Sequence, residues 1–598
     1  MNAEIRKLVI QIIIISVVVI YLTRLFYIQV VDRTSASEIR KKEVRAPRGL
    51  IKDRNGEVIV ANQPMYDLML VAKNLKHFDT LLLCDLIRVE KKIIIDKLDK
   101  AKKLPYKPFL FKRQLDFKEY AVFQEHLHEF TGFYSEVHTK RAYPFRSAAH
   151  VMGYVGKVDS SQILKFKGVY NDQDFIGKTG LESTYESYLK GSKGEAWLLY
   201  DVHNRVKGKF KNGERDKLPV PGFNLVTSID IDLQNYGEEL MNNKRGSVVA
   251  IEPSTGEIIA FISSPSYDPS GMVGGKRGAV FEKLKKDTLK PLFNRPVMAM
   301  YPPGSTFKTI MSLIGLEEGF VKSKTKYKCN GLKKKPGIVT CHDHDKVKGI
   351  RDAIRFSCNN YYSLLMKEHF SQKKFTNASI AYERWYDYVS SFGLGKKLTK
   401  EFPFETSGNL PKYNYYDKLY GKGRWKAPTI ISLSVGQGEL LMTPIQIANV
   451  FAVIANRGYY ISPHLVKWIE LENGIKEIKF DTLKIPVDKR HFEKVVSGLE
   501  DVVQKGTARR SKIKSIDMCG KTGTAENPHG KDHSVFAAFA PKDQPKIAIA
   551  VFVENSGFGS TWAAPIASLM IERYINKEIQ GKQRLSMEKR MLEGNLIQ

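Results

Sequence analysis

Cysteine is scarce in this sequence, and the few cysteines are unevenly placed. Only five occur among 598 residues, and three of them fall between 329 and 358. This number and placement exclude the disulfide framework of a small secreted scaffold. Fixed-period repeats and low-complexity segments are also missing, whereas 42% of the residues are hydrophobic, which is enough to fill real cores. We therefore expect a folded chain of several domains.

Acidic residues are too few to balance the basic ones. Asp and Glu total 64 against 95 Lys and Arg, which gives a formal net charge of +31. A polyanionic partner such as nucleic acid would match this charge. Lysines that merely solvate the surface explain it more simply, because no single basic run dominates the total.

Long hydrophobic runs are missing except at the N-terminus. Residues 8–31 are almost wholly apolar and follow Arg6 and Lys7. A membrane span needs about 20 residues, and the preceding basic residues favour a cytoplasmic N-terminus. We expect a cytoplasmic tail over 1–7 and a transmembrane anchor over 8–31, with a cleaved signal peptide as the alternative. Both interpretations export the rest of the chain, so no nucleic acid partner is expected.

Two folded parts follow the anchor. Over 32–235, short β-rich runs with Gly and Asn turns alternate with helical stretches, which predicts an irregular α+β pedestal or dimerisation-like domain. Over 236–576, apolar hairpins and long apolar helices predict an antiparallel sheet flanked by helices. The polar residues 577–598 are expected to form a C-terminal tail. The predicted fold class is thus α+β and multidomain.

The sharpest local motif is a Pro/Gly turn that leads into an apolar helix, Tyr301-Pro302-Pro303-Gly304-Ser305-Thr306-Phe307-Lys308. Residues at i and i+3 share a helix face, so we expect Lys308 to reach the Ser305 hydroxyl. Apolar surroundings favour the neutral amine, which can act as a general base for a serine nucleophile. The alternative is a capping serine and an ordinary lysine, because S-x-x-K often occurs by chance.

Two further motifs follow in order, Ser357-Cys358-Asn359 and, on a predicted strand, Lys521-Thr522-Gly523-Thr524. The ordered set S-x-x-K, S-x-N and K-T-G is typical of β-lactamases and penicillin-binding proteins. A Ser–Asn pair can pass a proton and hold a substrate amide, while the lysine charge and the threonine hydroxyls suit a terminal carboxylate. The backbone N–H groups of Ser305 and Thr524 are expected to form an oxyanion hole.

With these motifs the chain resembles the class B penicillin-binding proteins, which are monofunctional peptidoglycan D,D-transpeptidases. The resemblance covers nearly the whole length, and it is strongest to the elongation-specific branch, penicillin-binding protein 2. Further matching segments are Arg45-Ala46-Pro47-Arg48-Gly49, Asp53-Arg54-Asn55-Gly56, 176–182, Gly436-Gln437-Gly438, Gly506-Thr507-Ala508 and 533–541. Val535 stands where the family pattern leads us to expect tryptophan, which puts the local pocket shape in doubt.

The resemblance implies acyl transfer. Ser305 attacks a D-Ala carbonyl of a donor stem peptide, and an amine of a neighbouring stem peptide resolves the acyl-enzyme into a cross-link. The implied catalytic residues are Ser305, Lys308, Ser357, Asn359 and Lys521, and the implied substrate-binding residues are Thr522, Gly523 and Thr524. No cofactor is needed for catalysis, and β-lactam antibiotics are expected to acylate the serine.

The resemblance also implies a cellular setting. A membrane glycan polymerase of the RodA type and an MreC-type scaffold are the expected partners, because no polymerase signature is found in the chain itself. The expected location is the bacterial inner membrane, with a single span and the catalytic domain in the periplasm. The division-specific paralogue and a D,D-carboxypeptidase on the same fold are the alternatives.

The clustered cysteines suggest a metal site made by Cys329, Cys341, His344 and Cys358. Three thiolates and one imidazole suit tetrahedral zinc in a structural role. Cys358 lies within the S-x-N motif, so a metal there would brace that loop. A Cys329–Cys341 disulfide with a buried Cys358 is the alternative, and His342 is an alternative ligand to His344.

Overall fold

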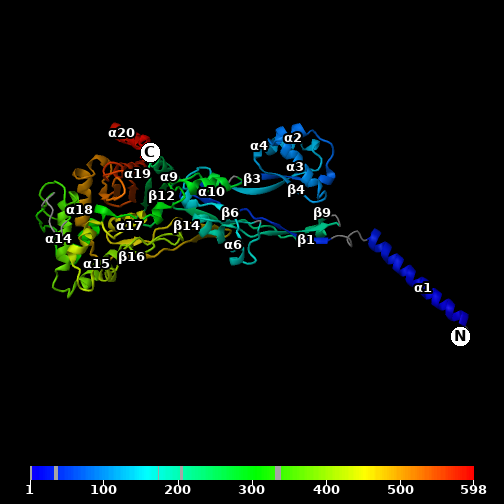
Figure 1. Ribbon diagram of the computed structural model, residues 1–598, viewed down its shortest axis with the longest axis horizontal. Coiled ribbons are helices and arrows are strands. Elements are labelled where there is room, and N and C mark those ends of the chain that lie inside the picture. The colour runs from blue at the N-terminus through cyan, green and yellow to red at the C-terminus, as the bar shows by residue number, and fades with distance from the viewer. Residues whose placement is uncertain are drawn as a thin grey trace. The chain divides into compact units, whose positions relative to one another are not determined.

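The structure is a computed structural model that describes residues 3–31, 38–172, 174–201, 206–275, 277–329, 331 and 339–597. The chain forms two compact units (Figure 1). The first unit comprises Met1–Gly49, Asn62–Arg141 and Lys190–Gly222, and the second comprises Leu50–Ala61, Ala142–Leu189 and Phe223–Gln598. Helices and strands are mixed in both, as expected for an α+β multidomain chain.

The first unit begins with an apolar helix, α1 (Ala3–Phe26), which continues as a π-helical turn over Tyr27–Val31. The stretch Glu4–Val30 is long and apolar enough to cross a membrane, and none of its most apolar window is buried by protein. It is the one helix of this kind in the described part of the chain. These properties fit the predicted single-pass membrane anchor.

The rest of the first unit contains a three-stranded antiparallel sheet and a small α/β head. The sheet has the order β1-β8-β9, and in the head the later part of β3 pairs with β4 and β5. Leucine and phenylalanine side chains of the head bury one another beneath its helices. The elements are β1 (Glu38–Val44), β3 (Val58–Leu70), α2 (Thr80–Ile87), α3 (Lys91–Lys102), β4 (Phe109–Leu115), α4 (Phe117–Glu125), β5 (Phe133–Ala142), β8 (Gly194–Tyr200) and β9 (Val206–Lys209).

The second unit carries the predicted catalytic motifs and most of the helices. Its N-terminal elements are β2 (Ile51–Lys52), α5 (Ala149–Met152), β6 (Val155–Lys157), α6 (Ser160–Lys165), β7 (Phe175–Gly177), α7 (Gly180–Thr184), α8 (Glu186–Leu189), β10 (Asn224–Thr227) and α9 (Ile231–Leu240). Its helices after α9 are α10 (Arg277–Lys286), α11 (Arg295–Met298), η6 (Gly304–Phe307), α12 (Lys308–Glu317), α13 (Ile350–Arg355), α14 (Asn359–Phe370), α15 (Ala378–Ser391), α16 (Tyr413–Tyr420), η7 (Ala427–Val435), α17 (Pro444–Ala455), α18 (Lys489–Lys505), α19 (Ala563–Asn576) and α20 (Lys582–Glu593). The remaining strands are β11 (Gly246–Ile251), β12 (Ile258–Ser264), β13 (Tyr459–Ile461), β14 (Val466–Leu471), β15 (Gly474–Glu477), β16 (Thr482–Lys484), β17 (Cys519–Ala525), β18 (His533–Ala540) and β19 (Ile547–Val553).

A five-stranded antiparallel sheet forms the centre of this unit, with the order β12-β11-β19-β18-β17. Every residue of β11, β12 and β19 is buried, because these strands are nearly continuous apolar runs that pack on both faces. Helix α17 covers one face, and α9 and α19 cover the other (Figure 1). Strand β17 is the edge strand, so one side of the K-T-G segment is free to meet other parts of the chain.

Residues of the predicted domain 32–235 are found in both compact units, and the boundaries of that domain stay a prediction. Leu50–Ala61 and Ala142–Leu189 lie with the catalytic sheet rather than with the pedestal part. Strand pairing explains this division, because β10 pairs in parallel with β2 and antiparallel with β14. These long-range pairings join segments that composition alone assigned to one domain.

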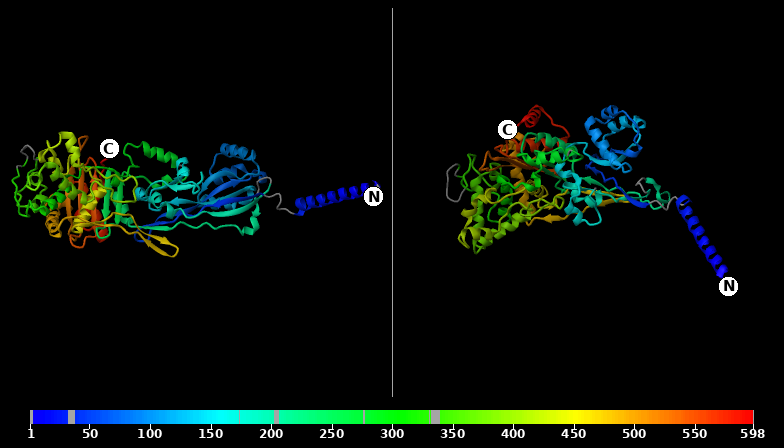
Figure 2. Two further views of the ribbon diagram at one scale, coloured as in Figure 1. Left: turned by 90° about the horizontal axis from the view of Figure 1, so that it is seen from below. Right: turned by 45° about the vertical axis from the view of Figure 1, so that its right-hand side comes forward.

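The polar C-terminal residues, predicted as a tail, form the packed helix α20. Met591 is fully buried, and Glu588 accepts a hydrogen bond from the Tyr236 hydroxyl of α9 at 2.7 Å. Arg584 forms an ion pair with Glu572 of α19 at 2.7 Å. The right-hand view of Figure 2 shows α20 in red at the surface of the unit. A few tertiary contacts therefore order a segment whose composition is that of a solvated tail.

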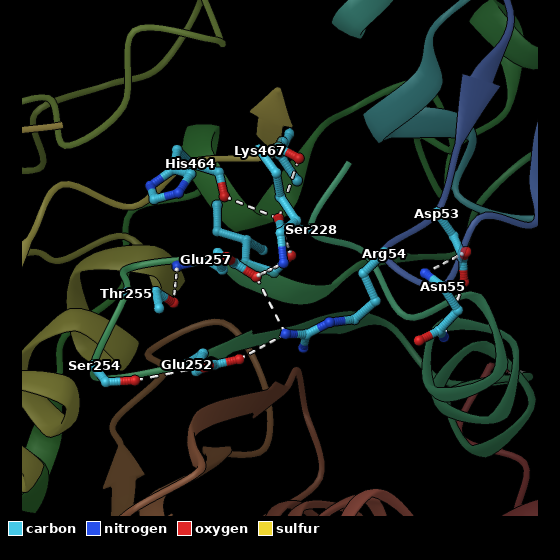
Figure 3. Close-up of polar contacts among 12 residues, drawn as sticks. Asp53, Arg54, Asn55, Ser228, Glu252, Ser254, Thr255, Glu257, His464 and Lys467 are labelled. Carbon is cyan, nitrogen blue, oxygen red and sulfur yellow. Dashed lines mark hydrogen bonds and ion pairs between the residues drawn. The ribbon is translucent and has the colours of Figure 1, made fainter. Parts of the chain in front are cut away.

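The turn between β2 and β3 is fixed by a partly buried arginine (Figure 3). The Arg54 guanidinium donates to Glu252 at 2.7 Å, to Glu257 at 3.2 Å and to the Tyr574 hydroxyl at 2.9 Å. Lys467 makes a second ion pair with Glu257 at 3.1 Å. One guanidinium thus ties three distant parts of the catalytic unit together.

The variant Arg54→Ala is expected to lower the free energy of unfolding by about 2 kcal/mol, because the partly buried Glu252 loses its cation while Glu257 keeps its ion pair with Lys467. Thermal unfolding followed by circular dichroism measures this change. The exposed Arg490 offers a matched control, Arg490→Ala, which should leave the midpoint unchanged. Equal midpoints for both variants would show that the Arg54 contacts contribute nothing.

Candidate active site

Ser305 lies on the short helix η6, which runs directly into α12. Pro303 precedes the helix with the backbone angles of a helical residue, and Gly304 has a φ of +54°. A Cβ atom at Gly304 would lie 2.7 Å from the Thr524 carbonyl oxygen. Glycine is therefore required at this position for the turn to approach strand β17. The result is a partly exposed serine beside the K-T-G strand.

Lys308 is fully buried behind this serine. Its Nζ donates to the Ser357 carbonyl oxygen at 2.8 Å, to Ser357 Oγ at 3.2 Å and to Asn359 Oδ1 at 2.6 Å. Burial lowers the pKa of Lys308 to about 8. A substantial fraction of the amine is then neutral near physiological pH and can accept a proton.

The expected hydrogen bond from Lys308 to Ser305 is not formed in the described residues. All three Lys308 hydrogen bonds go to the S-x-N loop instead. The i, i+3 rule places both side chains on one helix face, but oxygen acceptors on the neighbouring loop decide where the lysine points. The S-x-N loop and the lysine thus form one unit beside the serine.

Ser357 occupies the turn between α13 and α14 with a φ of +55°. This left-handed conformation costs a non-glycine residue about 1–2 kcal/mol. Hydrogen bonds from the backbone N–H groups of Ser357 and Cys358 to the end of α13 hold the turn, at 3.1 Å each. Backbone strain of this kind is found most often at functional sites. Here the strained conformation places the Ser357 hydroxyl between Lys308 and Lys521.

Lys521 approaches the same hydroxyl from β17. Its Nζ donates to Ser357 Oγ at 2.9 Å and to the Thr522 carbonyl oxygen at 3.0 Å. Burial, with a smaller contribution from the Lys308 charge, holds the pKa of Lys521 well below its usual value. Ser357 therefore bridges the two lysines and can relay a proton between them.

Two further side chains form hydrogen bonds with the K-T-G strand, and the predicted site did not include them. Thr507 shares a hydrogen bond of 2.6 Å with the Thr522 hydroxyl, and Gln437 donates to the Thr524 carbonyl oxygen at 3.1 Å. Both residues stand in segments that match the family pattern, and that is the signal by which the sequence points to them. Gly523 pairs with Val535 of β18, so valine lines this position in place of the expected tryptophan.

The clustered cysteines and one histidine converge beside the S-x-N loop. One donor atom from each of Cys329, Cys341, His344 and Cys358 lies within 4.8 Å of the others. Cys341 Sγ is 3.4 Å from His344 Nε2 and 3.9 Å from Cys358 Sγ. All five cysteines are free, so the alternative Cys329–Cys341 disulfide is not formed.

The surroundings of the cluster suit a metal. His344 Nδ1 is bonded to the Asp345 carbonyl oxygen at 2.7 Å, which leaves Nε2 for a ligand, as is usual for metal-binding histidines. The Asn359 backbone N–H donates to Cys341 Sγ at 3.2 Å. The donor set contains His344 rather than His342. Three sulfur atoms and one nitrogen fit tetrahedral zinc.

Two known protein domains match successive parts of the chain. Residues 246–572 match the penicillin binding protein transpeptidase domain, and residues 43–227 match the penicillin-binding protein dimerisation domain. The chain belongs to the penicillin-binding proteins. The predicted resemblance is thereby confirmed, and with it a pedestal domain and a transpeptidase domain on one chain.

Individual penicillin-binding proteins are similar over nearly the whole length. The peptidoglycan D,D-transpeptidase MrdA of Acinetobacter baumannii is 30% identical over 589 residues, which cover 93% of this chain and 84% of the relative. The crystal structure of Pseudomonas aeruginosa PBP2 in complex with WCK 5153 has 27% identity and a TM-score of 0.66, and covers 90% of this chain and 97% of the other. A chain of a peptidoglycan synthase complex has 26% identity and a TM-score of 0.74, and covers 96% and 99%. The enzyme class of this chain is therefore serine-type peptidoglycan D,D-transpeptidase.

Proposed function

We propose that Ser305 is the nucleophile of peptidoglycan cross-linking. The observation that carries this proposal is the group of side chains around Ser357, where the buried Lys308 and Lys521 share one hydroxyl next to the Ser305 turn. A neutral lysine, a proton relay and a carboxylate-binding strand are the parts that serine acyl transfer needs.

The first half of the reaction forms the acyl-enzyme. Neutral Lys308 accepts the Ser305 proton as Oγ attacks the penultimate D-Ala carbonyl of the donor stem peptide. The backbone N–H groups of Ser305 and Thr524 stabilise the oxyanion. Collapse of the tetrahedral intermediate breaks the peptide bond, and the proton passes through Ser357 to the amine of the departing D-Ala.

The donor peptide is bound by side chains of the S-x-N loop and of strand β17. Asn359 binds the amide of the donor peptide through its side chain, which also accepts from Lys308. Lys521, Thr522 and Thr524 bind the terminal carboxylate of the donor, and Gly523 allows its close approach. The second half repeats the first in reverse: an amine of a neighbouring stem peptide gives up a proton, attacks the ester and releases Ser305.

Zinc is proposed at Cys329, Cys341, His344 and Cys358, in a structural role. When bound, it would supply four strong bonds that fix the loop on which Ser357 and Asn359 stand. Cys358 lies between these two residues, and Cys341 already accepts a hydrogen bond from the Asn359 backbone. The catalytic chemistry itself is carried by protein groups.

The purified chain is expected to contain about one zinc per molecule by elemental analysis. Cys329→Ser should lose most of this metal and slow penicillin labelling, because one of the four ligands is gone. Cys84→Ser, in helix α2 outside the cluster, is the matched control and should keep both. Metal-free wild-type protein with normal labelling would contradict the site.

The proposed location is the bacterial inner membrane, with α1 as the single span and the catalytic unit in the periplasm. A structural relative belongs to a complex in which polymerization and crosslinking by a peptidoglycan synthase are coordinated. This supports a RodA-type glycan polymerase as partner. The MreC-type scaffold stays a prediction from the family resemblance. Relatives named MrdA favour the elongation branch over the division-specific paralogue.

The proposal is tested by incubating the purified chain and a glycan polymerase with lipid-linked precursor that carries pentapeptide stems. Muramidase digestion and mass spectrometry should show dimeric muropeptides that have lost one D-Ala per cross-link. Penicillin should prevent their formation. Monomers that have lost D-Ala without any dimers would identify a D,D-carboxypeptidase instead.

A further inference from the structure

A buried ionic cluster lies next to the turn that carries Ser305. Glu554 follows the last residue of β19 and is only 8% exposed. It accepts a hydrogen bond from the Tyr301 hydroxyl at 2.7 Å and forms ion pairs with Arg295 at 3.1 Å and Arg245 at 2.6 Å. None of these four side chains belongs to the S-x-x-K, S-x-N or K-T-G motifs.

The charges of the cluster fix the direction of its hydrogen bonds. Two guanidinium groups contact Glu554, and its carboxylate accepts the hydrogen bond from the Tyr301 hydroxyl. Burial and the adjacent carboxylate raise the pKa of Tyr301 well above its usual value, so the phenol keeps its proton and donates it. A neutral donor to a buried carboxylate is a charge-assisted hydrogen bond, which is stronger and geometrically stricter than a neutral pair.

Tyr301 begins the turn that ends in the nucleophile. Its backbone exchanges two hydrogen bonds with Met442, at 2.9 and 2.8 Å, and the N–H of Gly304 donates to Gly436 at 2.9 Å. The hydroxyl of the Tyr301 side chain forms its hydrogen bond with Glu554, at the end of β19. The turn is therefore held between two parts of the chain.

Aromatic side chains connect Tyr301 with the K-T-G strand β17. The Tyr301 ring stacks on Phe552 of β19 with centroids 3.7 Å apart. His533 contacts both rings, with centroid distances of 5.9 and 5.4 Å. In the sheet, His533 pairs with Ala525, the residue after Thr524. One cluster thus contacts both the Ser305 turn and the strand that bears Thr524.

We propose that Tyr301 and Glu554 are positioning residues for acyl transfer, which hold the Ser305 turn against β17 so that the backbone N–H groups of Ser305 and Thr524 converge on one oxyanion. This inference rests on the proposed role of Ser305. In this role neither side chain needs to touch substrate, since both are buried. Their effect is on the transition state, because the oxyanion forms only after attack and is sensitive to small displacements of its donors.

The test uses the full-length chain in detergent and the variant Tyr301→Phe, which keeps the stacked ring and removes only the hydroxyl. Stopped-flow acylation by a fluorescent penicillin, over a range of concentrations, separates the affinity of the first complex from the limiting acylation rate. We expect the limiting rate to fall by about 10- to 100-fold with little change in affinity. The control Tyr143→Phe removes another buried hydroxyl, which donates to the Gly153 carbonyl, and should leave the rate unchanged.

A double variant keeps the test independent of folding. Glu554→Gln should slow acylation as well, and adding Tyr301→Phe to it should cause little further loss if the two act as one unit. The labelling amplitude reports the fraction of folded protein, and the limiting rate constant is independent of it, so partial unfolding does not contribute to the comparison. A normal limiting rate in Tyr301→Phe overturns the inference, as do independent, multiplied effects of the two variants. Failure of the wild-type chain to label at Ser305 would instead overturn the proposed function.

Discussion

Replacing Ser305 by alanine is expected to abolish both covalent penicillin labelling and stem-peptide cross-linking. The hydroxyl is the only group that forms the acyl bond in the proposed mechanism, and removing a catalytic serine costs about 10⁶-fold in rate in a well-studied hydrolase. Gel labelling with a fluorescent penicillin should therefore show no band at any practical time.

The Ser305→Ala chain should remain folded, because the serine is partly exposed and its side chain makes no hydrogen bond within the described residues. Its thermal midpoint is expected to match that of the wild type. Ser568→Ala removes a buried hydroxyl of α19 and serves as the control that should keep labelling. A labelled Ser305→Ala chain would mean that another residue is the nucleophile.

Lys308→Met is expected to slow acylation by about 10²- to 10⁴-fold, the usual contribution of a general base. Methionine fills most of the volume of a buried lysine and carries no proton acceptor of comparable basicity. The loss should appear in the limiting acylation rate measured with penicillin. A limiting acylation rate of Lys308→Met within a few-fold of the wild-type rate would show that another group is the general base.

The pH profile of the wild-type chain gives a second check on Lys308. Its pKa is about 8 because burial disfavours the ammonium form. The neutral base is the active form, so the acylation rate should rise by about 50-fold between pH 6 and pH 8 and level off above that. A rate that falls with rising pH over this interval would contradict a neutral-amine base.

The candidate catalytic residues can be named from the sequence because each motif is short and local, and their roles stay a prediction. Ser305 and Lys308 lie on one helical segment, and the K-T-G residues lie on one strand, as expected. The direction of Lys308 could not be predicted in this way. Its partners are 49 and 51 residues away, and only the fold decides which oxygens surround the amine.

Long-range pairing also limited the prediction of the fold. The Arg54 contacts and the Tyr301–Glu554 hydrogen bond join residues about 200 and 253 positions apart, and no local pattern indicates them. Helix α20 was missed because its composition is polar, although the buried Met591 and polar contacts such as those of Glu588 and Arg584 pack it against the unit. The four residues predicted as metal ligands lie close together, and their binding of a metal stays a prediction.

The most direct test of the central claim is mass spectrometry of the wild-type chain after a short pulse of penicillin. Intact mass should increase by one penicillin, and peptide mapping should place the adduct on Ser305. The adduct should persist for hours, as expected of a transpeptidase and not of a β-lactamase. An adduct on another residue, or none on folded protein, would contradict the account; an adduct lost within minutes would indicate a hydrolase.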